Sequence, residues 1–467
     1  MKKLTVMTIL STAVLMSSCG LYKKYERSAT VDTTTLESIM RDADKYADTT
    51  DTTSFGDVAW REVFTDPHLQ VLIYQGLENN VDVHGAAVAV GKLTEALKAA
   101  RLAFLPTVAF NTSSQPIGSL QNVFAGKMRN SEWSKDYSLP ITASWNVDLF
   151  GKILATKRGA QVGLEMAKDY QQAARSGVIC GVANCYYTLL MLDRQLEILQ
   201  EMEALSKNTW EMMKLQKELR GARETSVVSA EAAYLNVQSN IVEMKRQITA
   251  TENALSLLIG QPAQAISRGK LADQTMPEKF STGLPLRILA VRPDVHAAEM
   301  NLASCFYDVE VARAAFYPSL NISASAIFSN ALGNPGNFVA SFMGSLMQPI
   351  FMNGRLRYAL KAAKLDYEQA EREWKQSVLN AGSEVSNALV EYQSSKEKGE
   401  LDRKQVAALE KSVSYTQDLF KMGSSSYLEV LSAQANLLNA EISAVKDDFN
   451  KMQAVVNLYS ALGGGRN

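Results

Sequence analysis

A helix that stops at a proline and continues as a strand occurs twice in this sequence, and this feature strongly constrains the fold. The two copies read Ala99-Ala-Arg-Leu-Ala-Phe-Leu-Pro106 and Val311-Ala-Arg-Ala-Ala-Phe-Tyr-Pro318, 212 positions apart. At that offset, ten of the 32 residues from 82 to 113 are identical. Proline cannot continue a helix and biases the preceding residue towards extended geometry. The chain therefore reads as a tandem duplication in which Pro106 and Pro318 mark helix-to-strand junctions.

Beyond each proline, the spacing of apolar residues changes from helical to alternating. Residues 137–148 and 320–329 alternate apolar with polar side chains, which predicts strands with one apolar and one polar face. A shorter strand is expected from about residue 108 to 113, and a fourth, less regular one from 338 to 351. Turn-rich segments at 119–134 and 330–337 would join each strand pair. Three aromatic residues in this region could anchor a barrel at a membrane interface, or one of them could be strand core: Trp133, Tyr137 and Trp145.

Long proline-free spans follow each strand pair. No proline occurs between Pro140 and Pro262, and none occurs after Pro349. Each span begins as a predicted helix of about 65 residues, which at 1.5 Å per residue is roughly 100 Å long. Breaks at residues 220–225 and 421–426 end these helices, and a second long helix returns from each break. Helices of this length exceed what an ordinary globular domain needs.

The returning helices have apolar residues at alternating spacings of three and four. In the first repeat the stripe is Ala230, Tyr234, Val237, Ile241, Met244, Ile248, Thr251, Leu255 and Leu258. In the second it is Leu428, Leu431, Ala435, Leu438, Ile442, Val445, Phe449, Met452, Val456 and Tyr459. Sustained heptad spacing predicts coiled-coil packing of antiparallel neighbours.

The N-terminus has the pattern of an export signal. Lys2 and Lys3 precede an apolar run of residues 4–16, which is too short to span a bilayer as a helix. Cys19 follows two serines, as in a bacterial lipoprotein cleavage site, so residues 1–18 are expected to be a signal peptide and Cys19 to carry acyl chains such as palmitate. An ordinary secretory signal with a chance cysteine is the alternative. The glycine after Cys19 indicates sorting to the outer membrane.

The rest of the chain divides around the duplication. Residues 19–59 are polar and are expected to form a lipidated, extended segment. Two structural repeats follow, at 60–262 and 285–464, joined by a linker at 263–284. Each repeat would contain a helix, a strand pair and a long helical hairpin. Four strands cannot close a barrel, and open strand edges cannot face lipid. Three chains would supply 12 strands, an even number within the range of known outer-membrane barrels.

Several motifs together resemble the TolC-type outer-membrane efflux proteins, in particular their lipoprotein branch that serves RND-type drug-efflux pumps. They are the segment 60–72 with Asp66-Pro67, Arg292-Pro-Asp-Val-His-Ala-Ala-Glu299, both proline junctions, and Gly423 with Tyr427-Leu-Glu-Val-Leu-Ser-Ala-Gln434. The resemblance implies an α+β membrane protein: a homotrimer with a 12-stranded transmembrane β-barrel, continued by a long periplasmic α-helical coiled-coil barrel. It also implies a Gram-negative outer-membrane location in contact with lipid, a periplasmic adaptor and an inner-membrane RND-type transporter. The function expected is passive export of small molecules or drugs.

The resemblance also places candidate gate residues at the second helical break. Glu429 matches an acid that rings the closed pore in the family, although Ser432 stands where a second acid is common. Three Glu429 carboxylates near a threefold axis would repel, raise one another's pKa and favour cations. Alternatively, Glu429 is an ordinary solvated charge. Phe420 matches a family tyrosine and Ser425 a family arginine, so we expect a more hydrophobic gate.

No catalytic, cofactor or nucleic-acid motif appears. The formal net charge is −1, which gives no bulk attraction for nucleic acid. His84 and His296 occupy the same repeat position near expected helix starts, where aspartate caps, so we expect no metal site. Besides Cys19, the cysteines are read as buried, unpaired residues: Cys180, Cys185 and Cys305. The chain is therefore not expected to be an enzyme. Two other readings remain: a channel for type I polypeptide secretion, and a coiled-coil periplasmic adaptor lipoprotein.

Overall fold

The computed structural model describes residues 23–27, 54–110, 113–114, 137–219, 223–277, 280, 292–329, 337–349 and 352–466. These residues form two compact units. The first draws its described residues from 1–28, 90–166 and 298–374, and the second from 29–89, 167–297 and 375–467. Each unit therefore contains segments of both sequence repeats, so the predicted repeats are not the spatial units.

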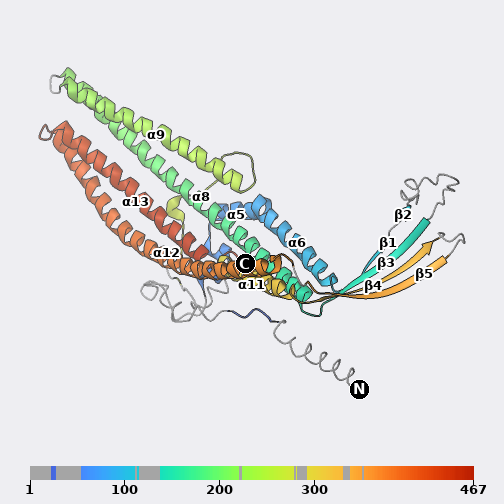
Figure 1. The fold of residues 1–467 in the computed structure, drawn as a ribbon. Helices are drawn as coiled ribbons and strands as arrows, with labels where there is room; N and C mark the ends of the chain where they lie inside the picture. The colour runs from blue at the N-terminus through green and yellow to red at the C-terminus, as the bar shows by residue number, and fades with distance from the viewer. Residues whose placement is uncertain are drawn as a thin grey trace. The chain divides into compact units, whose positions relative to one another are not determined.

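The first unit contains one antiparallel sheet (Figure 1). Its strands are β1 (Thr107–Phe110), β2 (Ser113–Ser114), β3 (Tyr137–Val147), β4 (Ser319–Ser329) and β5 (Asn337–Met347). The order is β1-β3-β4-β5, and β2 also pairs with β3. The predicted strands at 137–148 and 320–329 are confirmed within one residue. The fourth strand ends at Met347, four residues earlier than predicted. The predicted loops at 119–134 and 330–337, and Trp133, lie outside the described residues except for Asn337.

The register of the strands places apolar side chains beside apolar ones, and polar side chains mainly beside polar ones, across the sheet. One set of aligned rows is apolar: Phe110–Ile141–Ala326–Ala340, Val108–Ala143–Ala324–Phe342 and Val147–Leu320–Leu346. The alternate rows are mainly polar: Thr107–Ser144–Ser323–Met343, Ala109–Thr142–Ser325–Ser341 and Asn146–Asn321–Ser345. Because successive strand residues point to opposite faces, the sheet has one apolar and one mainly polar face. Within the described chain, exposed apolar residues include Val108 at 70% and Phe342 at 77%.

Four helices enter or leave this sheet. α6 (Val81–Leu102) ends before β1, and α11 (Pro293–Ala314) ends before β4. Pro106 and Pro318 directly precede those strands. α8 (Lys152–Glu218) follows β3 and α12 (Arg355–Lys421) follows β5. Each contains 67 residues, which confirms the predicted length of about 65.

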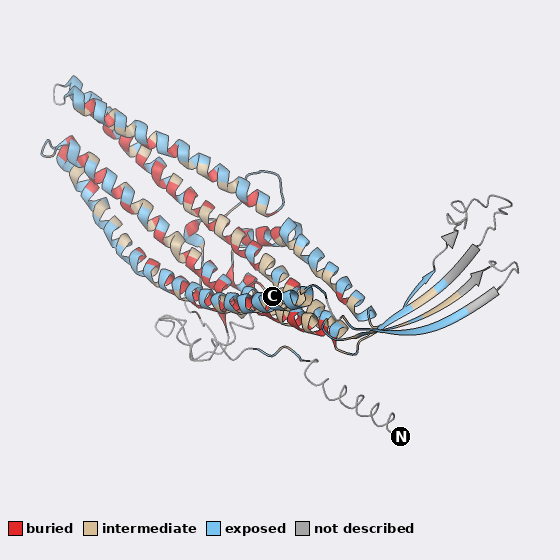
Figure 2. Cartoon of the chain, viewed as in Figure 1, coloured by how far each residue is buried: buried red, intermediate tan, exposed pale blue. Residues whose placement is uncertain are grey.

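Each long helix turns back into a second helix of 35 residues: α9 (Glu224–Leu258) after α8 and α13 (Tyr427–Ala461) after α12. Figure 1 shows both hairpins, and Figure 2 shows buried residues recurring along one side of each long helix. In the first hairpin, Leu199 and Met202 of α8 pack with Val237 and Ile241 of α9. The predicted stripe of α9 is confirmed as its inner face, with six of its members buried or nearly so: Ala230, Val237, Ile241, Ile248, Leu255 and, partly, Met244.

The predicted stripe of α13 is confirmed only in part in its first half, where Leu431 and Leu438 are partly buried. Leu428 is 72% exposed, and the buried residues there are Tyr427, Val430, Ala433, Leu437 and Ala440. The stripe holds in the second half, where Val445, Met452, Val456 and Tyr459 are buried. Near the turn this helix therefore has two apolar faces: Leu431 and Leu438 of the predicted stripe pack partly against the first hairpin, and the more deeply buried face is the one that the heptad count did not select.

The single helix expected before Pro106 is divided into two by Asn80. α5 (Pro67–Asn79) is capped by Asp66, whose Oδ1 accepts a hydrogen bond from the His68 N–H at 2.8 Å. Asn80 is extended, and its Oδ1 accepts from the Asp82 N–H at 2.8 Å while its Nδ2 donates to the Leu258 carbonyl. The asparagine therefore caps α6, a role that the sequence interpretation had given to aspartate.

Three short elements complete the description: η2 (Phe55–Asp57), α4 (Trp60–Val63) and η3 (Leu271–Asp273). Cys180, Cys185 and Cys305 are unpaired, as predicted, but only Cys180 is fully buried. Within the described ranges, no helix is both long and apolar enough to cross a bilayer.

Candidate functional site

The two predicted gate residues flank the turn between α12 and α13: Phe420 lies at the end of α12 and Glu429 at the start of α13. Gly423 has φ +74°, a left-handed conformation that favours glycine because it has no Cβ. The Ser424 N–H donates to the Leu419 carbonyl at 2.8 Å, and the Gly423 N–H donates to the Phe420 carbonyl at 3.0 Å. This pair of bonds is a Schellman motif, which ends α12 and satisfies its last carbonyls. Ser426 then caps α13, its Oγ accepting from the Glu429 N–H at 3.4 Å.

Glu429 lies in the first turn of α13 with its side chain exposed. The Ser425 hydroxyl donates to Oε2 of Glu429 at 2.5 Å. This hydrogen bond stabilises the charged form and is the main cause of a lowered pKa of Glu429, followed by the bonds to Ser426. Glu429 forms no ion pair with any described residue of its own chain. The expected repulsion in a ring would act in the opposite direction and raise the pKa.

Sequence reasoning missed the role of Ser425. That serine was considered only as the position where a family arginine is absent. The spacing Ser425–Glu429 is one helical turn, and a serine at the turn can reach an acid in the first turn of the next helix. The signal was therefore present in the sequence, but a serine four residues before a glutamate is too common to single out.

Phe420 has a different environment from Glu429, although both belong to the same turn region. It is 8% exposed and lies in an apolar cluster with Met213, Val227, Ala230, Tyr427 and Val430. These residues come from α8, α9, α12 and α13, so the cluster joins the ends of the two hairpins. Phe420 therefore contributes packing at the turn, in the second unit.

A second contact between the hairpins is polar. Gln434 of α13 is buried and donates from Nε2 to the Thr209 Oγ1 of α8 at 3.2 Å. The next residue of α8, Trp210, stacks on Tyr234 of α9 with ring centroids 5.5 Å apart, and the Lys214 Nζ lies 3.2 Å from the Trp210 ring centroid. At the first hairpin's own turn, Glu224 forms an ion pair with Lys217. Glu224 at the turn of the first hairpin is thus paired with a lysine, whereas the Glu429 carboxylate at the turn of the second hairpin accepts a hydrogen bond from Ser425.

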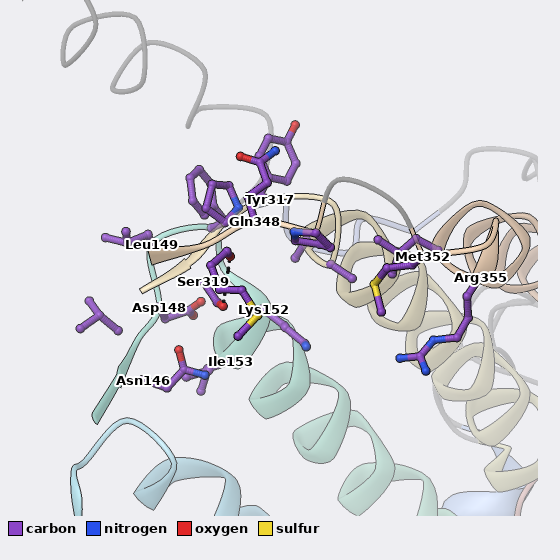
Figure 3. A pocket seen from close by; sticks show the side chains of 18 residues that line it. Asn146, Asp148, Leu149, Lys152, Ile153, Tyr317, Ser319, Gln348, Met352 and Arg355 are labelled. Carbon is purple, nitrogen blue, oxygen red and sulfur yellow. Dashed lines mark hydrogen bonds between the residues drawn. The ribbon is translucent and has the colours of Figure 1, made fainter. Parts of the chain in front are cut away.

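The strand–helix junctions line a hollow in the first unit (Figure 3). Its volume is about 550 Å³, and its lining includes Pro318, Ser319, Asp148, Lys152 and Arg355. Asp148 accepts a hydrogen bond from the Leu154 N–H at 2.8 Å, which caps α8. Phe150 stacks on Tyr317 with ring centroids 5.0 Å apart. These contacts fix the path of the chain between β3 and α8.

The aromatic residues at the junctions are only partly buried. Trp145 is 39% exposed, and its Nε1–H donates to the Phe104 carbonyl at 2.9 Å, just before Pro106. The side chain of Tyr137 lies outside what the structure describes, as does Cys19. Among the described residues, no group of three or more His, Cys, Asp or Glu side chains is arranged to hold a metal ion. His296 instead contacts Asp169, with Nδ1 2.7 Å from Oδ2.

Comparison with known proteins gives consistent matches over almost the whole chain. The family model described as outer membrane efflux protein matches residues 72–261 and 284–464. The chain is 25% identical over 468 residues to the cation efflux system protein CusC of Escherichia coli O6:H1 (strain CFT073), covering 97% of each chain. It is 26% identical over 420 residues to SilC of Salmonella typhimurium, described as a probable outer membrane lipoprotein, covering 88% of this chain and 89% of SilC.

A solved structure supports the same relationship. The open state of the MtrE outer membrane channel of Neisseria gonorrhoeae superposes with a TM-score of 0.79 and 26% sequence identity. The superposition covers 90% of this chain and 94% of that one. The two chains therefore share a fold over nearly their whole length.

Proposed function

The chain belongs to the outer membrane efflux protein family, and from that premise we propose that it is the passive outer-membrane duct of a tripartite efflux system. Three copies would form one channel that passes small solutes from the periplasm, or from an inner-membrane RND-type transporter, to the exterior. A periplasmic adaptor would join the channel to the transporter. The transporter would supply the energy and select the substrate, so the duct itself needs neither catalysis nor a cofactor.

The two-faced sheet is the observation that supports this proposal most strongly. Its apolar rows would face lipid, and its mainly polar rows would face an aqueous lumen. Within one chain, β1 and β5 lie at opposite ends of the strand order and run antiparallel to each other. β5 of one copy can therefore pair with β1 of the next in the antiparallel sense. Because β1 and β2 both pair with β3 and together make one edge strand, each copy contributes four strands, and three copies close a ring of 12. This closure removes the open edges that lipid would not tolerate.

The helical part supports the same assembly. The apolar face that α13 leaves exposed near its turn includes Leu428, and α12 exposes Leu401 at 63%. Long helices with a second apolar face bury it against neighbouring helices, as in coiled-coil barrels. At 1.5 Å per residue, α8 and α12 are each roughly 100 Å long, a length suited to a conduit through the periplasm.

The anchor and the gate complete the proposal. Cys19 would carry acyl chains, a role for which the description of SilC as a lipoprotein is a precedent. Glu429 from three copies would form a ring of carboxylates at the pore constriction, with Phe420 packing the helices around it. A ring of negative charge favours cations, and the name of CusC refers to cation efflux. We therefore include cations among the small solutes proposed for this duct.

Planar-bilayer recording of the purified full-length protein tests this function. We expect discrete conductance steps from the trimer, because its lumen is lined by polar side chains and filled with water. The same preparation after thermal denaturation serves as the control and should give no steps. Absence of conductance from a folded trimer, both in its native form and with Glu429→Ala to widen the constriction, would contradict a duct.

A further inference from the structure

The start of α12 is densely cationic. Arg355, Arg357, Lys361 and Lys364 lie within the first ten residues of the helix, where no acid occurs. Acids dominate directly after this stretch, at Asp366, Glu368, Glu371 and Glu373. Three of the cations, Arg357, Lys361 and Lys364, are spaced by four and three residues, so they lie on one face of the helix. All four cationic side chains are exposed.

This arrangement opposes the usual charge preference of a helix. The first turn carries the positive end of the helix dipole, which favours acidic side chains. α8 and α12 both lack an acid in their first turn, and both begin with a cation, Lys152 and Arg355. Of the four cations of α12, only Arg355 and Arg357 lie in the first turn and bear this cost; within the described chain, none of the four forms an ion pair. Cations at a helix start that no acid of the same chain neutralises indicate a negatively charged partner outside the chain.

The N-terminal segment brings two further cations to the same unit. We call residues 23–27 the strap. Arg27 forms a bidentate ion pair with Glu299 of α11, at 2.6 and 2.7 Å. The Tyr25 N–H donates to the Tyr307 hydroxyl at 3.3 Å, and Arg158 of α8 donates to the Lys23 carbonyl at 2.8 Å. Lys23 and Lys24 themselves remain exposed.

Aromatic contacts connect the strap to the part of α12 that follows the cationic residues. Tyr25 packs edge-on against Phe306, with ring centroids 5.9 Å apart, and Phe306 lies 6.3 Å from Tyr367 of α12. Lys364 precedes Tyr367 by three residues, so the two side chains lie on adjacent parts of one helix face. Cys19 is four residues before Lys23, a reach of at most about 14 Å. An acyl anchor there would hold a bilayer surface close to these cations.

We propose that the basic band, defined as Lys23, Lys24, Arg158, Arg357, Lys361 and Lys364, binds the anionic headgroups of phospholipids in the leaflet that borders the helices. This inference rests on the proposed function, because it requires the sheet to span a membrane. The band lies in the unit that contains the sheet, at the helix ends that follow the strands. Basic residues at that level meet the headgroup region, and an acyl chain combined with a basic patch gives firmer attachment than either alone.

The test uses the full-length protein in nanodiscs made either of phosphatidylcholine alone or of phosphatidylcholine with an equal part of phosphatidylglycerol. Spin-labelled phosphatidylglycerol reports the fraction of anionic lipid held at the protein boundary. The test variant is Arg357→Gln/Lys361→Gln/Lys364→Gln. The matched control is Lys396→Gln/Lys404→Gln/Lys411→Gln, which removes three cations from the same helix more than 30 residues further along.

We expect wild type and the control to prefer phosphatidylglycerol over phosphatidylcholine at the protein boundary. In the test variant, this preference should be at least about fivefold weaker at low salt. The difference should vanish near 1 M salt, where charges are screened over about 3 Å. Equal preference in the test variant and wild type would overturn the proposal. Full competition by inorganic phosphate would assign the band to free phosphate and also overturn it.

Single-channel recording of the same variants separates this proposal from the proposed function. If the test variant alters ion selectivity and leaves lipid preference unchanged, the cations face the lumen and the lipid proposal is wrong. If no variant conducts but the lipid preference depends on the basic band, the channel function fails and the lipid site stands.

Discussion

The Ser425 hydroxyl donates a hydrogen bond to Glu429 Oε2 at 2.5 Å, across the turn that joins α12 to α13. Glu429 is also held by Ser426, which caps the same helix. The Ser425 bond orients the exposed carboxylate and favours its charged form, whereas Ser426 binds the backbone N–H. Glu429 has no ion-pair partner among the described residues, which is compatible with the proposed carboxylate ring.

Replacing Glu429 with alanine should reduce the cation preference of the channel. In the proposed trimer, the change removes three negative charges from the constriction, so the permeability ratio of potassium to chloride should fall by at least about threefold. Reversal potentials in a salt gradient measure this ratio. Glu218→Ala, which removes an exposed acid at the end of α8, is the control and should leave the ratio unchanged. Unchanged selectivity in Glu429→Ala would rule out the carboxylate ring.

Ser425→Ala should change the pH at which that selectivity is lost. The Ser425 hydrogen bond lowers the pKa of Glu429, so the wild-type carboxylate stays charged to a lower pH than the same carboxylate without that bond. Without the serine hydroxyl the pKa rises, and cation preference should disappear at a higher pH as the solution is acidified. Selectivity titrations of wild type and variant provide the comparison. Coincident midpoints would show that the hydrogen bond does not set the charge of Glu429.

Phe420→Ala should loosen the joined ends of the hairpins. Phe420 is buried in the apolar cluster, and removing such a ring costs about 3–5 kcal/mol of free energy of unfolding where the site cannot collapse. The neighbouring Leu419 is 47% exposed, so Leu419→Ala should cost much less. Hydrogen exchange of α12 and α13 near the turn measures the local effect. Equal protection in the two variants would show that Phe420 does not hold these helices together.

Gly423→Ala should strain the turn without any steric clash. A Cβ on Gly423 would meet no atom within 4 Å, but φ is +74°. The left-handed backbone alone should cost about 1–2 kcal/mol. Gly163 in α8 also has open space around it but is helical, and Gly163→Ala should instead stabilise by about 1 kcal/mol. Thermal melts should show a lower melting temperature for Gly423→Ala and a higher one for Gly163→Ala. A higher melting temperature for Gly423→Ala would contradict the left-handed conformation of the turn.

Much of the fold could be predicted from the sequence because its signals are long and repeated. The alternation in residues 137–148 identifies β3, and two proline-free spans identify α8 and α12. Long periodic patterns sum many weak preferences into one clear choice. The helix break at Asn80 was missed because a single capping residue gives only a local signal within an otherwise helical stretch.

The details of the site were less predictable because they depend on tertiary contacts. α13 has two apolar faces near its turn, and only packing against α8 and α12 decides that Val430 is buried and Leu428 exposed. The strap is too short to show a pattern, and the pairing of Arg27 with Glu299 joins residues far apart in the sequence. The position of Glu429 at a turn followed from the sequence, but its hydrogen-bond partner did not.

Closure of the sheet into a barrel requires two further copies of the chain. Crosslinking at the sheet edges tests this requirement. Cysteines replacing Ala109 of β1 and Ser341 of β5 would place one thiol on each edge strand of the polar face. A bismaleimide that spans roughly 10 Å, about two strand spacings, would link them across a β5–β1 contact between copies. The native cysteines are first replaced, at Cys180, Cys185 and Cys305. The control pair, at Ser144 and Ser323, lies on β3 and β4 of the same chain in direct register.

Crosslinking in intact outer membranes, followed by denaturing electrophoresis, is the most direct measurement. We predict that the edge pair gives dimers and a closed trimer, with nothing larger, because the third copy meets the first. The control pair should link only within one chain and migrate as a monomer. Monomers alone from the edge pair, or a ladder that continues beyond the trimer, would contradict closure by three copies.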